Sequence, residues 1–421
     1  MWAYGAAGRL AEPLAGFFLS RRERRGMEDG RRRGERFGRG GCPRPAGPLV
    51  WVHATSIGET VAALPLIEVL TERGLSVVLT TNALAAAQVA ETRLPPGAIH
   101  QYAPIDTPGS IDRFLDHWRP GLVLFAESEL WPTTLKCLER RGLPLVLVSG
   151  RMSERSFRAW RRMEPLARAV LGRTAACLTQ SAVDAERLRA LGAGSVEICG
   201  NLKYDVAPPP ADANAVDEMR ARIGDRFVLL GASTRPGEEA AVLAAHAAVA
   251  GGGMDLLTIL APRHAWRGEP LAAEIADAGL RGKRRSQGEA IDPDTEIYLA
   301  DTTGEMGLWY RVADVAFLGG SISPRGGQNP IEPAKLRIPV LHGPYVANFR
   351  DVYGALRSAD AATCVEDGDA LAAAVMLLCQ DADARERLAS RAYDCVERSS
   401  GALDRTVKAL EPYLARLTPP S

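Results

Sequence analysis

Residues 49–72 read LVWVHATSIGETVAALPLIEVLTE, and this stretch decides the fold. Its first part, Leu49–His53, is apolar up to a closing histidine, which is typical of a buried strand. Its last part, Thr60–Glu72, carries a helical pattern, and a few small and polar residues join the two. A short apolar strand that leads directly into a helix is the repeating unit of a parallel sheet.

The same unit recurs along the chain, in two halves of similar size. Further apolar runs predict strands in the first half at Ser76–Thr80, Leu122–Ala126 and Leu143–Val148. The second half is predicted to contain strands at Phe227–Gly231, Asp255–Ala261, Ile297–Ala300, Val315–Leu318, Leu336–His342 and Ala361–Cys364, and helices at Glu238–Ala250 and Ala402–Leu417. We therefore predict an α/β protein with two doubly wound, Rossmann-like halves, and a ligand at the carboxyl ends of the strands in the crevice between them.

The length of 421 residues is more than one core usually serves, which agrees with two domains. The stretch 206–215, VAPPPADANA, is rich in proline and has no periodicity, so it predicts a linker. We expect five segments in chain order: a leader 1–47, a first domain 48–205, a linker 206–215, a second domain 216–401, and a C-terminal helix and tail 402–421.

The overall charge excludes one class of partner. The 51 basic and 51 acidic side chains cancel, which gives no support for binding to nucleic acid. Seven scattered cysteines form no C-x-x-C pair. They predict reduced thiols in a cytoplasmic setting, with neither a zinc site nor a disulfide framework.

The leader departs from this balance. Residues 1–50 contain eleven arginines and five acidic residues, and aromatic and apolar side chains precede the cluster Arg21–Arg25. The apolar run is too short and too interrupted to span a membrane, and it lacks the pattern of a secretory signal. We interpret the leader as an interfacial segment on an anionic membrane surface. The alternative is a disordered basic tail.

Three motifs of the first half carry candidate catalytic side chains. Glu59 follows the first strand and falls in the first turn of the next helix, where a carboxylate can act as general base toward a sugar hydroxyl. The alternative is that Glu59 only favours the helix N-terminus. Ser56 is a poor candidate nucleophile because Ala54 replaces the first glycine of a G-x-S-x-G elbow.

The other two motifs are ESELWP, 127–132, and GNLKYD, 200–205. Glu129 stands at the carboxyl end of a predicted strand, although it could instead cap the next helix. Lys203 precedes the linker and can neutralise a phosphate or carboxylate, although it could instead be a surface lysine.

The second half suggests a nucleotide site. Pro262 and Arg263 end a strand, and Thr303, Gly304 and Glu305 follow another. Glycine-rich residues 319–327 lead to Asn329-Pro330-Ile331-Glu332, where free N–H groups and a helix N-terminus would suit a phosphate. A plain turn with a capped helix is the alternative. Asp292-Pro293-Asp294 is formally D-x-D but lies in a turn-rich stretch, so no metal site is predicted.

Together these blocks resemble the Kdo (3-deoxy-D-manno-octulosonic acid) transferases over nearly the whole chain. The blocks are HATSIGE, PIDTPGSIDRFLDHWRP, ESELWP, GRMSERS, GNLKYD, ASTRPGEE, APRH, DTTGEM, GGSISPRGGQNPIEP and GPYVANF. The chain departs from the family pattern at Ser149-Gly150, at Arg235 and at Gln328, which concerns fine substrate contacts.

The resemblance implies a GT-B fold and inverting transfer of Kdo from CMP-Kdo to a lipid A precursor, without metal or cofactor, at the cytoplasmic face of the bacterial inner membrane. It implies Glu59 as general base, with Glu129 and Lys203 supporting the transition state. It implies that CMP is held by Pro262, Arg263, Thr303, Gly304, Glu305, Asn329, Pro330, Ile331 and Glu332. Two alternatives stay open: an epimerase or transferase for another nucleotide sugar, and a non-catalytic, membrane-bound scaffold that binds nucleotide.

Overall fold

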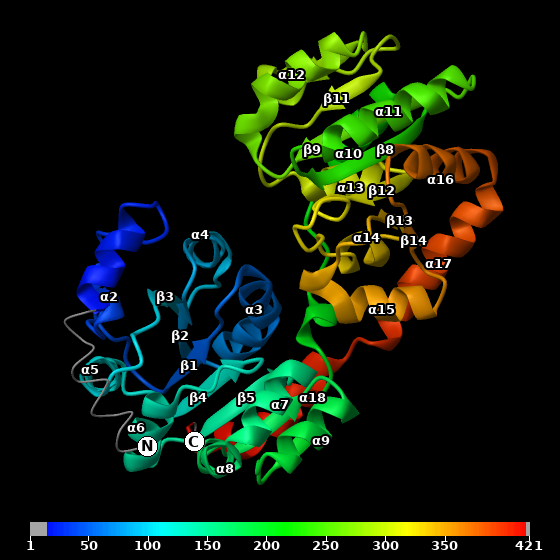
Figure 1. The fold of residues 1–421 in the computed structure, drawn as a ribbon. Coiled ribbons are helices and arrows are strands. Elements are labelled where there is room, and N and C mark those ends of the chain that lie inside the picture. Colours follow the sequence, from blue (N-terminus) through cyan, green and yellow to red (C-terminus); the bar gives the residue numbers. More distant parts are fainter. Residues whose placement is uncertain (1–14, 418–421) are drawn as a thin grey trace. The chain divides into compact units, whose positions relative to one another are not determined.

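A computed structural model describes residues 15–417 (Figure 1). The chain divides into two compact units, Met1–Val206 with Ser399–Ser421, and Ala207–Arg398. Each unit contains a seven-stranded sheet in which every strand pair is parallel. The predicted α/β class with two doubly wound halves is confirmed.

The sheet of the first unit has the strand order β3-β2-β1-β4-β5-β6-β7. Its strands are β1 (Leu49–His53), β2 (Ser76–Thr81), β3 (Ala98–Tyr102), β4 (Leu122–Ala126), β5 (Leu145–Gly150), β6 (Ala176–Thr179) and β7 (Val196–Ile198). Its helices are α2 (Arg33–Arg36), α3 (Ile57–Glu72), α4 (Leu84–Arg93), α5 (Pro108–Trp118), α6 (Pro132–Arg140), α7 (Glu154–Arg162), α8 (Glu164–Leu171), α9 (Ala182–Ala190) and α18 (Ala402–Leu414), with a 3-10 turn, η1 (Leu202–Asp205). The strand order reverses direction between β1 and β4, so the switch point of this sheet lies there.

Both faces of this sheet are buried, which explains why its strands are continuously apolar. Alternate residues of β1 enter two different cores: Val50 and Val52 pack with residues of α3 and α18 on one face. Leu49 and Trp51 pack with α5 and α6 on the other face. β1 is an interior strand, between β2 and β4, so its carboxyl end lies within the edge of the sheet and is flanked by other strand ends.

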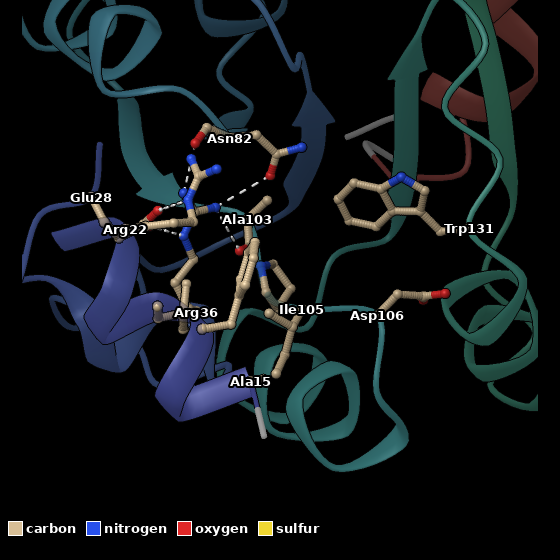
Figure 2. Close-up of a pocket in the computed structure, with 12 residues that line it drawn as sticks. Ala15, Arg22, Glu28, Arg36, Asn82, Ala103, Ile105, Asp106 and Trp131 are labelled. Atoms are coloured by element: carbon tan, nitrogen blue, oxygen red, sulfur yellow. Dashed lines mark hydrogen bonds and ion pairs between the residues drawn. The ribbon is translucent and has the colours of Figure 1, made fainter. Parts of the chain in front are cut away.

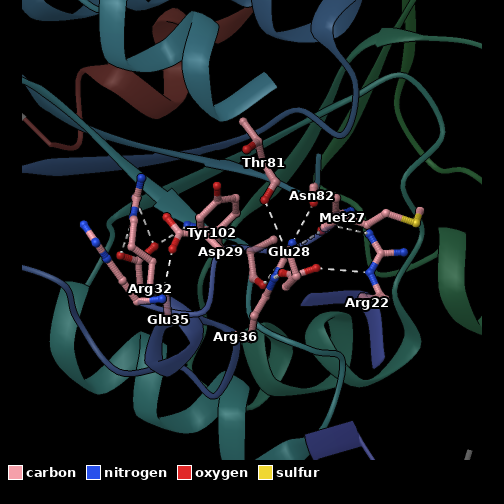
Figure 3. A network of polar contacts seen from close by, with 12 residues as sticks. Arg22, Met27, Glu28, Asp29, Arg32, Glu35, Arg36, Thr81, Asn82 and Tyr102 are labelled. Atoms are coloured by element: carbon pink, nitrogen blue, oxygen red, sulfur yellow. Dashed lines mark hydrogen bonds and ion pairs between the residues drawn. The ribbon is translucent and has the colours of Figure 1, made fainter. Parts of the chain in front are cut away.

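The described part of the leader is folded onto the first unit, so the reading of a disordered tail is wrong for residues 15–47. Residues 15–23 are helical, and residues 1–14, with the aromatic Trp2 and Tyr4, lie outside the described part. The buried Arg36 donates to Glu28 at 2.5 Å and to the carbonyl oxygen of Asn82 at 2.6 Å (Figure 3). Several leader arginines therefore serve the fold.

A second set of contacts ties the leader to β3. The buried Glu35 accepts a hydrogen bond from the backbone N–H of Tyr102 at 2.7 Å and from Arg32 at 2.9 Å (Figure 3). Arg32 also pairs with Glu91 of α4 at 2.7 Å. β3 is the last strand at one edge of the sheet. These ionic groups lie along that edge and cover it.

The sheet of the second unit has the order β10-β11-β9-β8-β12-β13-β14, with its switch point between β8 and β12. Its strands are β8 (Phe227–Thr234), β9 (Leu256–Pro262), β10 (Gly282–Arg284), β11 (Ile297–Leu299), β12 (Val315–Leu318), β13 (Val340–His342) and β14 (Thr363–Cys364). Its helices are α10 (Ala213–Ile223), α11 (Glu238–Gly251), α12 (Gly268–Asp277), α13 (Met306–Val312), α14 (Ile331–Lys335), α15 (Arg350–Ser358), α16 (Gly368–Gln380) and α17 (Ala382–Arg398). Two buried apolar clusters again lie on the two faces of the sheet.

Two boundaries differ from the sequence prediction. The predicted linker 206–215 is too long, because Asp212 accepts a hydrogen bond from the N–H of Asn214 and starts α10 at Ala213. The predicted C-terminal segment 402–421 is no separate piece, since α18 packs into the first unit. There Asp205 accepts from the N–H groups of Gly401 and Leu403 at 2.6 and 3.0 Å.

Within residues 15–417, no helix combines the length and the apolar character needed to cross a bilayer. The cysteine side chains are all free thiols.

Candidate active site

The carboxyl ends of β1 and β4 bring the predicted catalytic residues of the first unit together. β1 and β4 are hydrogen-bonded neighbours at the switch point of the sheet. Glu59 lies in the first turn of α3, six residues after the end of β1, and Glu129 lies three residues after the end of β4. Lys203 enters from η1, and its side chain runs beside Gly58, where an added Cβ would lie 3.8 Å from the lysine Cε.

Glu59 is anchored by the helix that carries it. Its carboxylate accepts the backbone N–H of Thr55 at 2.7 Å and the hydroxyl of Ser56 at 2.9 Å. The Ser56 hydroxyl in turn accepts the backbone N–H of Glu59 at 3.3 Å, so the two residues form a reciprocal cap. The structural role considered for Glu59 is therefore real, and it also fixes the carboxylate in one orientation.

The surroundings of Glu59 favour its protonated form. Burial raises the pKa of its carboxyl group, and repulsion from Glu127 and, less strongly, from Glu129 raises it further. The hydrogen bonds from Thr55 and Ser56 act in the opposite direction but do not cancel the rise. A raised pKa makes the Glu59 carboxylate a stronger base than a free glutamate.

The two carboxylates of the ESELWP motif have different partners. Glu127 forms a salt bridge with Lys203, with 2.8 Å between Oε1 and Nζ. It also has a φ of 55°, a left-handed backbone conformation that costs energy in a non-glycine residue and is often found at functional sites. Glu129 instead accepts from the indole N–H of Trp131 at 2.7 Å. The sequence analysis singled out Glu129 and Lys203, but Glu127 is the residue that orients the lysine.

His53 ends β1 beneath this group and supports it. Burial lowers the pKa of its imidazole to about 3, so the ring is neutral at physiological pH. Its Nδ1 lies 2.8 Å from the hydroxyl of Thr80, and its Nε2 lies 3.2 Å from the hydroxyl of Thr55. The backbone of Thr55 binds Glu59. A histidine that closes a buried strand was the available sequence signal.

The glycine-rich loop of the second unit differs from expectation, because its N–H groups are not free. The carboxylate of Glu238, at the start of α11, accepts from the backbone N–H groups of Gly320, Ser321, Ile322 and Ser323 at 2.6, 2.8, 3.0 and 3.3 Å. Glu238 is fully buried. The loop that follows β12 is thus organised around an internal carboxylate, and sequence reasoning missed this residue.

The helix that begins near Asn329–Glu332, as predicted, is short. α14 has five residues, beginning at Ile331, and Pro330 precedes it. The side-chain oxygen of Asn329 accepts from the N–H of Ile331 at 3.1 Å, and its amide donates to Glu332 at 3.3 Å. Asn329 and Glu332 are therefore adjacent and hydrogen-bonded to each other.

Arginines gather at the carboxyl ends of β8 and β9, around the predicted Arg263. Pro262 is the last residue of β9, and Arg263 is exposed beyond it. The pKa of Arg235 is lowered by burial and by the nearby positive charges of Arg263 and Arg325. One guanidinium nitrogen of Arg235 lies 2.9 Å from Nε2 of His264. The positive charges of Arg263 and Arg325 near Arg235 form a site that suits an anion.

The segment after β11 lies next to this group in the sheet, because β11 pairs with β9. Thr303 and Gly304 precede Glu305, and Gly304 has a φ of 89°. Glu305 is the residue before α13 and binds Arg285 at 2.6 Å. Asp292 closes a turn with Thr295 at 2.7 Å and accepts the N–H of Asp294, as expected for a turn.

Comparison with known proteins identifies the family. A family model described as 3-deoxy-D-manno-octulosonic-acid transferase (Kdo transferase) matches residues 31–206. The 3-deoxy-D-manno-octulosonic acid transferase of Haemophilus influenzae is 32% identical over 386 residues, 90% of each chain. This chain belongs to the Kdo transferase family. The Bordetella pertussis Kdo transferase is 37% identical over 434 residues, covering 98% of this chain and 99% of the relative.

Solved structures share the GT-B fold of this Kdo transferase at low identity. A glycosyltransferase from Rickettsia africae gives a TM-score of 0.56 at 11% identity, over 90% of this chain and all of the other. A UDP-GlcNAc 2-epimerase from Neisseria meningitidis gives a TM-score of 0.56 at 13% identity, over 87% of this chain and all of the other. At such identities the likeness concerns the fold, which both glycosyltransferases and epimerases use.

Proposed function

We propose that this Kdo transferase moves Kdo from CMP-Kdo to a hydroxyl group of a lipid A precursor, with inversion at the anomeric carbon. The observation that carries the proposal is the half-buried Glu59 carboxylate at the switch point of the first sheet. It is fixed by Thr55 and Ser56, and its pKa is raised. We assign activation of the acceptor to the first unit and binding of the donor to the second.

Acceptor activation is general base catalysis by Glu59. Its carboxylate takes the proton of the acceptor hydroxyl, and the oxygen attacks the anomeric carbon while the bond to the phosphate of CMP breaks. Glu129 and Lys203 stabilise the transition state. Because Lys203 is bound to Glu127, we add Glu127 as the residue that holds the ammonium group in place.

Donor binding uses the carboxyl ends of the second sheet. CMP-Kdo carries a phosphate and a sugar carboxylate, and the arginine group of Arg235, Arg263 and Arg325 supplies positive charge for such anions. We propose that the remaining contacts to CMP come from two short segments and the residue before Arg263. The residues proposed to contact CMP are Pro262; Thr303, Gly304 and Glu305; and Asn329, Pro330, Ile331 and Glu332.

We propose that transfer needs no metal, because the fixed cations of the second unit can receive the leaving phosphate. Asp292 of the formal D-x-D pair pairs with Lys283 at 3.4 Å and accepts the backbone N–H of Asp294 in a turn. Transfer should survive EDTA. Loss of activity in EDTA that magnesium or manganese restores would contradict this part of the proposal.

We also propose that the enzyme works at the cytoplasmic face of the inner membrane, held there by its leader. Phe17 and Phe18 are 67% and 59% exposed. Arg21, Arg24 and Arg25 are exposed as well, whereas Arg22 pairs with Glu28. Exposed aromatic and cationic side chains on one short segment suit an anionic bilayer surface.

The decisive experiment combines purified protein, CMP-Kdo and a lipid A precursor, with mass spectrometry of the lipid. Glu59→Gln keeps an amide oxygen that can accept the Thr55 N–H but removes the base. Transfer should fall about 10²–10⁴-fold while CMP affinity by calorimetry stays unchanged. Ser56→Ala is the comparison variant, since it removes the cap of the same helix and one of the two hydrogen bonds to the carboxylate, costs about 1 kcal/mol of stability, and keeps the base, so transfer should fall far less. A near-parental rate for Glu59→Gln would remove Glu59 from the mechanism, and transfer only from uridine nucleotides would point to another donor.

A further inference from the structure

An apolar cavity of about 290 Å³ lies between the leader helix and the end of β3. The leader lines it with Ala15, Phe18, Leu19 and Arg22, which recur at the spacing of one helix face. The sheet side contributes the chain that follows β3 and one aromatic side chain from the start of α6 (Figure 2). The lining residues on this side are Ala103, Pro104, Ile105, Asp106 and Trp131.

The polar side chains in the lining are already engaged with protein partners. Arg22 and Arg36 both bind Glu28, at 3.1 and 2.5 Å (Figure 3). Asp106 accepts from the backbone N–H groups of Thr134 and Thr133 at the start of α6, at 2.8 and 3.2 Å. The cavity therefore offers an apolar wall whose polar side chains are already bonded to protein groups, which suits a hydrocarbon chain better than a polar ligand.

The cavity is connected to the candidate catalytic carboxylates by two of its own walls. Trp131 lines it and donates its indole N–H to Glu129 at 2.7 Å. Asn82 lines it on another side, and its amide lies 3.5 Å from the hydroxyl of Thr55, the residue whose N–H binds Glu59. A molecule with a sugar at Glu59 and a hydrocarbon tail can thus place the tail here.

The outer face of the same helix suits the headgroup side of such a molecule. Phe17 and Arg21 are one turn apart on the helix and exposed, and Arg24 and Arg25 follow them. These positive charges complement an anionic lipid, while Phe18, the neighbour of Phe17, lines the cavity. Phe18 is also 59% exposed, so it lies at the rim of the cavity, next to the exposed arginines.

We propose that this cavity binds one acyl chain of the lipid acceptor and so makes the enzyme selective for acylated acceptors. The proposal rests on the proposed function, because it assumes a lipid acceptor whose sugar lies at Glu59. Each methylene buried in an apolar site is worth about fourfold in affinity. Acceptor KM should accordingly rise as the chain is shortened.

The first test does not depend on turnover. A lipid A precursor with a diazirine in one acyl chain, in phosphatidylglycerol vesicles, should photolabel Phe18, Ile105 and Trp131. Ala15→Trp fills the cavity from its helical wall and should abolish this labelling. Equal labelling of the cavity by a diazirine phosphatidylglycerol would show that it holds bulk lipid. Crosslinks from residues 1–14 to Ile105 without lipid would show that the chain covers its own cavity, and either result would overturn the proposal.

The second test uses the adjacent phenylalanines as a matched pair. In the parent, removing two methylenes from the acceptor chain should raise KM about 15-fold. Phe18→Ala should flatten this dependence, while Phe17→Ala should preserve it even if vesicle binding weakens. Equal chain-length dependence in the two variants would sink the proposal. If the protein transfers no Kdo, the photolabelling result still stands or falls alone, so the two failures are distinguishable.

Discussion

Glu238 and Glu239 are neighbours in sequence and are both fully buried, yet the structure predicts opposite results for removing their charges. The carboxylate of Glu238 binds the loop after β12 through Gly320, Ser321, Ile322 and Ser323. One of its oxygens also accepts the N–H of Arg235 at 2.9 Å. Within residues 15–417 the oxygens of Glu239 accept no hydrogen bond, and Arg267 lies 3.8 Å from one of them.

The magnitude for Glu238→Gln follows from which oxygen is replaced. Oε1 serves Ser321, Ile322 and Ser323, whereas Oε2 serves Gly320 and Arg235. The glutamine oxygen will keep the side with three donors, so its NH₂ group faces the other two N–H groups. Two hydrogen bonds to a charged acceptor are lost, each worth about 1.5–3 kcal/mol. Opening of the loop should become easier by about 3 kcal/mol or more, roughly a hundredfold in its equilibrium constant.

Hydrogen exchange of residues 320–323, followed by mass spectrometry, measures this directly and avoids assuming that two units unfold as one. Glu238→Gln should speed exchange of these amides roughly a hundredfold. Glu239→Gln is the matched control and should leave them unchanged. Burial raises the pKa of Glu239, so the folded state binds its proton more readily than the unfolded state. The free energy of unfolding should then fall as the pH rises from the unfolded-state pKa of Glu239 to its raised folded-state pKa, and Glu239→Gln should remove this fall. Unchanged exchange in Glu238→Gln, or equal acceleration in both variants, would refute the reasoning.

Three further predictions concern catalysis, donor and membrane. Glu59 must be ionised to act as base, so kcat/KM should fall as pH drops through its raised pKa. Glu127→Gln removes a repelling charge and should shift this acidic limb to lower pH; an unmoved limb would separate Glu59 from the pH profile. Arg263→Ala and Glu332→Ala should each weaken CMP binding in calorimetry with an unchanged circular dichroism spectrum, and unaltered affinity in both would place the nucleotide elsewhere. Replacing the exposed Arg21, Arg24 and Arg25 with serine should weaken sedimentation with anionic vesicles at low salt, by about 1 kcal/mol per charge. Equal sedimentation of the variant and the parent would leave the leader without a membrane role.

The two parallel sheets, and the ends of several of their strands, could be predicted from local sequence patterns. Buried parallel strands are continuously apolar, so β1, β4 and β12 were predicted with the bounds that the structure has. Residues that follow such strands must lie at the carboxyl edge of the sheet, and this placed Glu59 and Glu129 at strand ends, whereas the pairing of β1 with β4 comes from the fold. Local rules sufficed because strand and loop are adjacent in the chain.

Only the tertiary structure decided the partners of these residues. Lys203 meets Glu127 across 76 positions, and Glu238 meets the loop at 320–323 across more than 80. No local pattern encodes such pairings, because they depend on which strand ends become neighbours. The same holds for the leader, where Glu28 and Glu35 neutralise arginines that composition alone assigned to a membrane. A charge has a defined role only once its buried counter-ion is known, and the counter-ion is supplied by the fold.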